Sequence, residues 1–213
     1  MRLFLASVAL AAGGVGAPPA VVPEVDLNRY QGVWYEIARY PNRFQNKCTG
    51  DVTATYELRP DGRIRVINRC QTSDGAVSVA EGVARLADGN GPTAKLKVRF
   101  APSWLSFLPA VWGDYWIIEL APDYSFAIVG HPKREYLWIL ARTPGMDDAT
   151  YKDLLQRLEQ KHGYDPSRLV RTRHSTADAA GSSRCSGHGC PGDVARKTTP
   201  SRRPASTAPR PDT

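Results

Sequence analysis

Long apolar runs are almost absent from this chain of 213 residues. The exception lies in residues 1–20, where Arg2 precedes an apolar run and then small residues, the pattern of a secretory signal peptide. A membrane-spanning helix needs about 20 apolar residues, and this run is shorter. We therefore predict a signal peptide over 1–20, with its cleavage position open, and an exported soluble product. No Cys lies near the expected cleavage region, so we do not expect a lipid anchor at the N-terminus.

Positive charge is scarce in the body of the chain, although the formal net charge is +7. Residues 171–213 hold eight Lys and Arg against three Asp, hence +5, and Arg2 adds one more. Residues 3–170 then carry only +1 of the total. This distribution excludes a basic nucleic-acid-binding face on the folded part, so we predict no nucleic acid partner.

Bulky apolar residues are missing from 171–213, where Val194 is the only Val, Leu, Ile or aromatic residue. Such a segment cannot bury enough apolar surface to offset the entropy of ordering, so we predict a disordered, basic, Ser/Pro/Arg-rich tail. A solvated tail is the favoured interpretation. Electrostatic adhesion to anionic lipid is the alternative.

Cysteine is also rare, with four residues in two pairs. In the tail, Cys185 and Cys190 flank His188. Three ligands in a flexible segment would make a weak metal site, so we favour a small disulfide loop or two free thiols. We predict no metal and no other cofactor.

Alternation of apolar and polar residues is abundant between residues 32 and 141, and this period of two is typical of half-buried strands. We predict eight strands, within 32–39, 52–58, 63–70, 77–83, 95–100, 115–120, 126–129 and 136–141. The links at 60–62, 88–91 and 122–124 are short, whereas those at 40–50, 71–76, 101–113 and 130–135 are longer.

Successive links between consecutive antiparallel strands lie at opposite ends of a sheet. One end of this sheet is therefore expected to be closed by tight turns, and the other open, with long loops. Eight meandering strands can close into an up-and-down barrel, which removes exposed edges and can hold one small ligand. The expected class is all-β, with the folded domain over 21–170.

One helix is predicted after the last long strand. Asp147 or Asp148 can cap it, Leu154, Leu155 and Leu158 form an apolar stripe, and Gly163 ends it. The stripe is expected to pack on the outside of the barrel. Leu169 and Val170 are expected to add a last short strand.

Three motifs carry a family resemblance. Gly32-Val33-Trp34-Tyr35 stands at the start of the first strand, Gly113-Asp114-Tyr115 at the start of the sixth, and Leu137-Trp138-Ile139-Leu140-Ala141-Arg142 in the eighth. Together with the following helix, the span of about 25–172 resembles the lipocalin family, in particular its bacterial lipocalin and apolipoprotein D-like branch.

The resemblance implies a closed end plugged by Trp34 and capped by Arg142. An Arg over a Trp face is a cation–π pair that contributes about 0.5–2 kcal/mol. Gly32 is expected to leave room where the chain enters the floor. Tyr35 is expected to point outward, toward the helix with Leu154 and Leu158.

Candidate ligand contacts follow from strand parity and from the resemblance. Parity places inside Val52, Ala54, Tyr56 and Leu58 of the second strand, and Tyr136, Trp138 and Leu140 of the eighth. Tyr56, Asn68, Tyr115 and Trp138 match pocket positions of the branch. The alternative is that they only fill the barrel core.

The long apolar loop over 100–112 carries two Trp and two Phe residues at the expected open end. Trp104 and Phe107 in this loop are further candidate ligand contacts. An apolar loop there suggests a lid, a homodimer contact or a lip that touches a membrane, and a simple fold-back onto the barrel is the alternative.

The resemblance implies that the cavity binds and stores or transports a fatty acid or lysophospholipid, in the periplasm or at the outer membrane, for maintenance of envelope lipids. Contact with the outer-membrane surface would accompany this role. An intracellular fatty-acid-binding barrel is a less favoured alternative, because the chain has an export signal.

The second and third strands form a hairpin around residues 60–62, and this bears on the remaining cysteines. Cys48 precedes the second strand and Cys70 ends the third, so both lie toward the open end of the hairpin. Their positions are close to cross-strand register, and an exported protein can oxidise them. We predict a Cys48–Cys70 disulfide.

Catalysis is the main rival class, and the residues favour it little. The domain has no Ser/His/Asp set, and His131 and His162 are isolated. Glu36 shares parity with Trp34 and is expected to face inward. An unpaired buried carboxylate there would be a candidate base, but a pairing with Arg or Tyr is more usual. We predict a binding protein without enzymatic activity.

Overall fold

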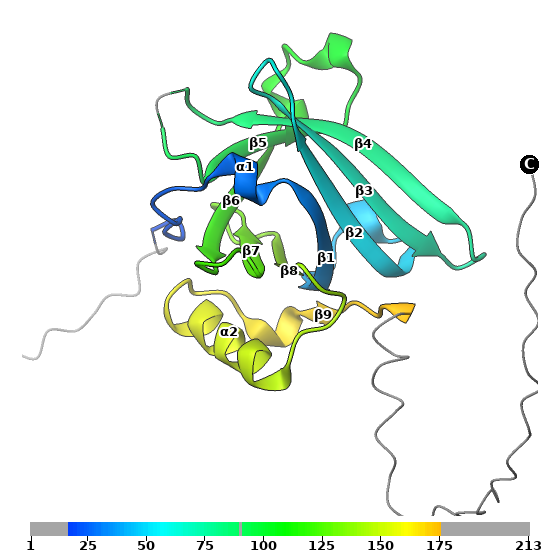
Figure 1. Ribbon diagram of the computed structural model, residues 1–213, viewed down its shortest axis with the longest axis vertical. Helices are drawn as coiled ribbons and strands as arrows, with labels where there is room; N and C mark the ends of the chain where they lie inside the picture. Colours follow the sequence, from blue (N-terminus) through cyan, green and yellow to red (C-terminus); the bar gives the residue numbers. More distant parts are fainter. Residues whose placement is uncertain (1–16, 90, 176–213) are drawn as a thin grey trace, which may run out of the picture. The chain divides into compact units, whose positions relative to one another are not determined.

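The computed structural model describes residues 17–89 and 91–175. Eight antiparallel strands form a closed barrel (Figure 1). They are β1 (Gly32–Arg39), β2 (Cys48–Leu58), β3 (Ile64–Thr72), β4 (Val77–Leu86), β5 (Lys95–Arg99), β6 (Gly113–Leu120), β7 (Phe126–Gly130) and β8 (Leu137–Ala141). Each strand pairs with the next, and β1 pairs with both β2 and β8, which closes the barrel. The predicted fold class is confirmed.

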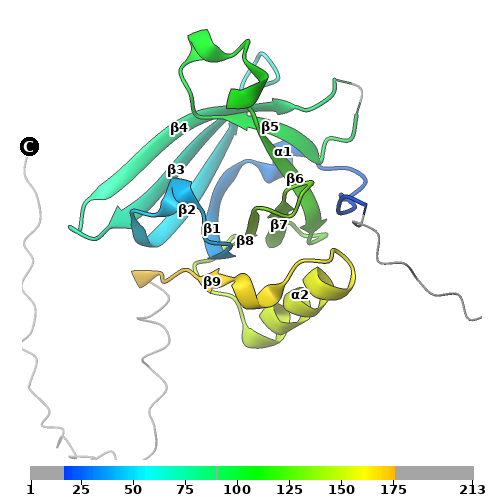
Figure 2. The same ribbon diagram turned by 180° about the vertical axis from the view of Figure 1, so that it is seen from behind.

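The described helices lie between and after these strands. They are α1 (Leu27–Tyr30), η1 (Arg43–Gln45), η2 (Ser103–Leu105), η3 (Pro109–Val111), α2 (Asp148–Gln160) and η4 (Pro166–Arg168). Asp147 caps α2 by accepting a hydrogen bond from the Thr150 backbone N–H at 2.9 Å. Helix α2 lies outside the barrel, as predicted (Figures 1 and 2). Within 17–89 and 91–175, no helix has the length and apolar character needed to cross a membrane.

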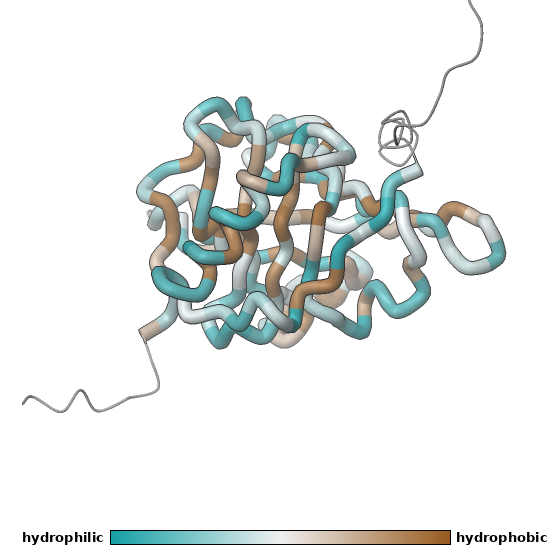
Figure 3. Tube along the Cα trace, turned by 90° about the horizontal axis from the view of Figure 1, so that it is seen from below, coloured by the Kyte–Doolittle hydropathy of each residue, from teal (hydrophilic) through white to brown (hydrophobic). Residues whose placement is uncertain are grey.

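The strands separate two apolar clusters. Along the chain, hydrophobic and hydrophilic residues follow each other at short intervals (Figure 3). The inner cluster includes Trp34, Tyr56, Val66, Leu96, Ile117, Val129 and Leu140. The outer cluster joins the barrel wall to α2 and includes Ile37, Ala38, Ile118, Ile128, Ile139, Leu154 and Leu158. Strands β1, β6, β7 and β8 contribute residues to both clusters, so α2 packs on the wall that these four strands form.

Two irregularities break strict alternation where the helix packs. In β1 the register toward β8 shifts between Glu36 and Ala38. As a result Ile37 and Ala38 both join the outer cluster. In β6 the register shifts between Ile117 and Glu119. Ile118 belongs to the outer cluster, and the next residue, Glu119, also lies on the α2 side, where it bonds to His162. An extra residue in one strand resets which face the following side chains occupy.

The last described segment runs from β9 (Val170–Arg171), which pairs with β1, to Ser175. We call residues 172–175 the strap. The Thr172 N–H donates to the Ile37 carbonyl at 3.0 Å, and His174 Nε2 donates to the Glu36 carbonyl at 2.8 Å. The Ser175 N–H donates to Asp51 Oδ1 at 2.9 Å.

The strap corrects two predictions. Residues 171–175, which the composition assigns to the tail, belong to the folded domain, because the strap is bonded to β1 and β2. Tyr35 packs edge-on against His174, with ring centroids 5.5 Å apart, and not in the cluster around Leu154 and Leu158. Most of the predicted signal peptide and the rest of the tail, with Cys185 and Cys190, lie outside the described residues.

Candidate ligand site in the barrel lumen

The closed end is built around Trp34 and Arg142. Arg142 Cζ lies 3.8 Å from the centroid of the Trp34 ring. Its NH1 donates to the carbonyls of Gln31 at 2.9 Å and Val33 at 3.0 Å. Gly32 has a φ of 93°, and a Cβ there would stand 3.4 Å from Arg142 NH1. The pairing that the resemblance implies is therefore present, and glycine suits both the left-handed backbone and the narrow space.

Three tyrosines form the floor of the lumen above Trp34. The Tyr115 hydroxyl is hydrogen-bonded to the hydroxyls of Tyr30 at 2.9 Å and Tyr56 at 2.8 Å. Burial raises the pKa of Tyr56 to about 12 and also raises the pKa values of Tyr30 and Tyr115. Because these pKa values are raised, the three phenols stay protonated and the floor is neutral at physiological pH. Sequence reasoning missed Tyr30, which lies on α1 and outside every strand pattern.

Higher in the barrel, inward-facing side chains are only partly buried. Ala54, Asn68, Val98 and Trp138 are half-buried, whereas Trp34 is fully buried. Ala54 is in register with Asn68, and Ala54 and Trp138 both pack against the inner cluster. These inward-facing side chains are thus less tightly covered than those at the closed end. Within the described part of the chain, the Asn68 side chain has no hydrogen-bond partner.

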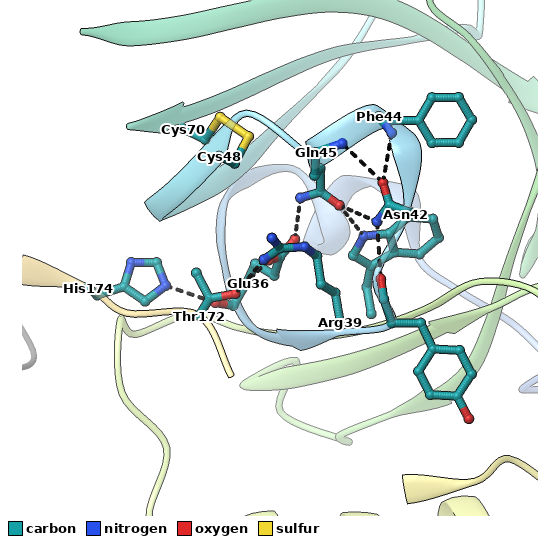
Figure 4. Close-up of polar contacts among 11 residues, drawn as sticks. Glu36, Arg39, Asn42, Phe44, Gln45, Cys48, Cys70, Thr172 and His174 are labelled. Carbon is teal, nitrogen blue, oxygen red and sulfur yellow. Dashed lines mark hydrogen bonds and ion pairs between the residues drawn. A yellow bond between two sulfur atoms is a disulfide. The ribbon is translucent and has the colours of Figure 1, made fainter. Parts of the chain in front are cut away.

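A hydrogen-bonded network ties η1 to the upper wall (Figure 4). Gln45 Nε2 donates to Glu36 Oε2 at 2.6 Å, and Gln45 Oε1 accepts from Trp138 Nε1 at 2.9 Å. Asn42 Nδ2 donates to the same Gln45 oxygen at 2.8 Å. Asn42 also caps η1, since its Oδ1 accepts from the backbone N–H of Phe44 and Gln45. Nothing in the strand periodicity pointed to Asn42 or Gln45.

Glu36 is 2% exposed and faces inward, as predicted. Its Oε1 accepts from Arg39 NH1 at 2.7 Å and from Thr172 Oγ1 at 2.5 Å. With Gln45 on Oε2, both carboxylate oxygens are occupied. The arrangement is that of a paired structural carboxylate and offers no free base.

Aromatic rings line the wall next to this network. Tyr136 stacks on Trp138 at an interplanar angle of 16°, with centroids 5.8 Å apart. Phe44 lies 5.7 Å from Tyr136, and His131 meets Tyr136 edge-on at 5.4 Å. Desolvation by burial lowers the pKa of His131. Arg43 lies over this aromatic cluster, with its Cζ 5.1 Å from the centroid of the Phe44 ring.

The apolar loop over 100–112 turns over the outer wall and forms no lid in this structure (Figures 1 and 2). Trp112 packs against outward-facing Arg85, with 4.4 Å from Cζ to the ring centroid. Trp104 is 71% exposed and Phe107 74% exposed. Neither belongs to the inner cluster that contains Tyr56 and supports Tyr115 and Trp138. The structure thus brings four of the predicted contacts to the lumen side and leaves these two on the loop.

The predicted disulfide is present. Cys48 and Cys70 are joined, with their Cα atoms 5.5 Å apart, at the start of β2 and near the end of β3 (Figure 4). The bond follows η1 directly in the chain. It therefore fixes the C-terminal end of the loop that carries Asn42 and Gln45.

A closed eight-stranded antiparallel barrel, an Arg-capped Trp at its closed end and a single helix outside define the lipocalin class. The chain belongs to the lipocalin family: residues 25–174 match the family model described as Lipocalin-like domain. Members of this family bind small hydrophobic ligands and are generally carriers, not enzymes.

Individual relatives agree with this assignment. The chain is similar to temperature-induced lipocalin-1 of Arabidopsis thaliana, with 47% identity over 73% of this chain and 82% of that protein. It is 40% identical to outer membrane lipoprotein Blc of Escherichia coli K12, over 70% of this chain and 80% of that protein. Apolipoprotein D of Macaca fascicularis is 32% identical, over 72% and 79%.

Among solved structures, insecticyanin of the tobacco hornworm Manduca sexta superposes with a TM-score of 0.55. The two chains share 23% identity, and the match covers 76% of this chain and 86% of insecticyanin. This likeness supports the fold.

Proposed function

We propose that the protein binds one single-chain lipid, a fatty acid or a lysophospholipid, in the barrel lumen and stores or transports it. The observation that carries the proposal is the half-buried inner wall formed by Ala54, Val98 and Trp138, with the unpartnered Asn68 among them. Such a wall provides apolar surface for an acyl chain and one polar group for its head.

Acyl burial supplies the affinity in this proposal. Each buried methylene contributes about 0.8 kcal/mol before ordering costs. The neutral tyrosine floor lets the apolar end of the chain lie deepest. Because Arg39 is already paired with Glu36, the upper wall offers no free cation from this pair. The head group is therefore expected to meet Asn68 by a hydrogen bond.

Lipid extraction of the native protein, followed by mass analysis, identifies the natural ligand. Affinity is measured by displacing a fluorescent fatty acid. Ala54→Trp fills the lumen and should abolish binding. Thr55→Trp places the same ring on the outer face of β2 and should leave binding intact. Absence of displaceable binding at micromolar protein would sink the proposal.

We also propose an envelope location. The relatives in Escherichia coli and Vibrio cholerae are named outer membrane lipoproteins, and residues 1–20 have the pattern of an export signal. Fractionation of cells that express the full chain tests this. Recovery from the cytoplasm with residues 1–20 still attached contradicts it.

Contact with a membrane surface is the second role that we propose. The exposed Trp104 and Phe107 support it, because exposed apolar patches mark protein or membrane contact sites. A Trp104→Ser/Phe107→Ser double variant should lose vesicle binding and retain the lumen ligand. If the variant instead turns a dimer into a monomer in light scattering, the loop is a homodimer contact.

A further inference from the structure

A buried arginine without an acidic partner stands at the end of β5. Arg99 is only 7% exposed. Its Nε atom is buried and lacks a hydrogen-bond partner among the described residues, and its NH1 donates to the Ala101 carbonyl. No carboxylate in 17–89 or 91–175 forms an ion pair with it. A buried charge is costly unless it is paired, so this guanidinium calls for a counter-charge.

A surface hollow meets Arg99 on the outer wall, beneath the loop over 100–112. Its volume is about 200 Å³. The lining residues that matter are Arg99, Arg59, Arg65, Glu81 and Ser103. One water occupies about 30 Å³ in the liquid, so the hollow has room for a tetrahedral oxyanion. It lies outside the barrel and shares no residue with the lumen site.

Two of the three arginines at the hollow are already paired. Glu81 is held by Arg65, with both carboxylate oxygens 2.9 Å from Arg65 NH2. Arg65 also holds Glu57, with its NH1 3.1 Å from Glu57 Oε2. Arg59 NH2 lies 3.2 Å from Asp61 Oδ2. Their side chains are 52% and 42% exposed, so water weakens the attraction between these two charges. Arg99 is therefore the arginine at the hollow that has no ion pair among the described residues.

A second arginine adds to the positive potential. Arg85 Cζ lies 4.4 Å and Arg99 Cζ 5.3 Å from the centroid of the same Trp112 ring. The indole offsets part of both charges through cation–π attraction. Like Arg99, Arg85 has no carboxylate partner in the part of the chain that the structure describes. Two unpaired guanidinium groups on one indole ring favour an anion nearby.

We propose that this hollow is a binding site for a phosphate group, carried by a phospholipid head group or free in solution. Arg99 supplies the buried charge, Arg59 a second cation and Ser103 a hydroxyl donor. Arginine suits this role because its planar fork of N–H donors matches phosphate oxygens. The site is independent of the lumen ligand.

The test uses the full chain and two probes. Inorganic phosphate is titrated by calorimetry at constant ionic strength, and vesicles of phosphatidylcholine with or without phosphatidylglycerol are co-sedimented. Arg99→Gln should weaken binding at least about tenfold, the usual effect of losing charge-assisted hydrogen bonds. Lys152→Gln removes one charge from the exposed face of α2 and should leave binding unchanged.

Arg59→Gln serves as a second variant, since its half-exposed side chain can be replaced without disturbing the fold, and it should weaken binding several-fold. Binding of both probes, or of phosphatidylglycerol vesicles alone, supports the site if these variants lose it, and the pattern tells free phosphate from a head group. No binding of either probe, or binding that both variants retain, overturns the proposal. Fluorescent fatty acid binding is measured in parallel, so failure here is distinct from failure of the lumen proposal.

Discussion

Glu36 and Arg39 form an ion pair of 2.7 Å on the inner face of β1, although they are three positions apart along one strand. Strict alternation would place them on opposite faces. The register shift between Glu36 and Ala38 adds one residue and returns Arg39 to the inner face, where it is in register with Trp138. The buried carboxylate thereby acquires a cation.

Truncation tests the strap that completes this pair. A chain ending at residue 170 loses the Thr172 hydroxyl on Glu36 Oε1 and the His174 ring beneath the Glu36 carbonyl. We expect a loss of about 2–5 kcal/mol in the free energy of unfolding, because buried polar groups lose their partners. Denaturant titration measures it. A chain ending at 175 keeps these contacts and should match the full chain, and equal stability of both truncations would contradict the structural role of the strap.

Trp34→Ala removes the ring that fills the closed end. We expect a loss of about 3–5 kcal/mol, as for other fully buried large aromatics. Thermal unfolding followed by circular dichroism measures it. Arg142→Met keeps much of the side-chain volume but deprives the carbonyls of Gln31 and Val33 of their donor. It should also lower the thermal midpoint. A Trp34→Ala protein as stable as wild type would contradict the role of Trp34 as the plug of the closed end.

Glu119 makes stability depend on acid. Its hydrogen bond to His162, at 2.8 Å, and those to Lys161 and Arg157 on the α2 side lower its pKa from 4.5 to about 2, against an opposing effect of burial. A lowered folded-state pKa stabilises the fold above pH 4.5, and this contribution is lost as the pH falls toward 2.

Glu119→Gln should therefore cost about 1–3 kcal/mol at neutral pH. The difference from wild type should shrink as the pH falls below 4.5. Urea titrations at several pH values measure this. Glu159→Gln changes an exposed carboxylate of α2 and should have little effect. A difference that stays constant down to pH 2 would argue against the assignment.

The tyrosine floor predicts an alkaline effect of opposite sign. Burial raises the pKa of Tyr56 from 10.0 to about 12, so the folded state holds this proton more tightly than the unfolded chain. Stability is then complete below pH 10 and decreases as the pH rises toward 12. Tyrosinate absorbance during alkaline titration should show phenols that ionise only in this range or on unfolding.

Tyr115→Phe leaves the hydroxyls of Tyr30 and Tyr56 without their shared partner. We expect a cost of about 1–3 kcal/mol, because both groups are buried. Tyr136→Phe is the matched control, since no hydrogen bond of its hydroxyl occurs among the described residues. Equal stability of the two variants would show that the triad contributes little.

Local rules accounted for the residues that repeat regularly. Period-two alternation placed Tyr56 and Trp138 on the inner face, and the hairpin geometry brought Cys48 and Cys70 together. These predictions hold because neighbours in a strand and in a hairpin are related by fixed geometry. They fail at Tyr35, where the helix was expected and the strap is present, because a strap is specified by contacts with residues more than a hundred positions away.

The sequence by itself determined the eight strands and the outside position of α2, because alternation, turns and an apolar stripe are local patterns, and its three motifs carried the family resemblance. Only the tertiary structure decided which groups neutralise Glu36, that Tyr30 joins the lumen floor, and that the loop with Trp104 and Phe107 turns over the outer wall. It also decided that Arg99 has no ion pair within 17–89 and 91–175. These features depend on one bulge, one strap and one loop path. No local pattern encodes them, since each is selected by the free energy of packing distant segments together.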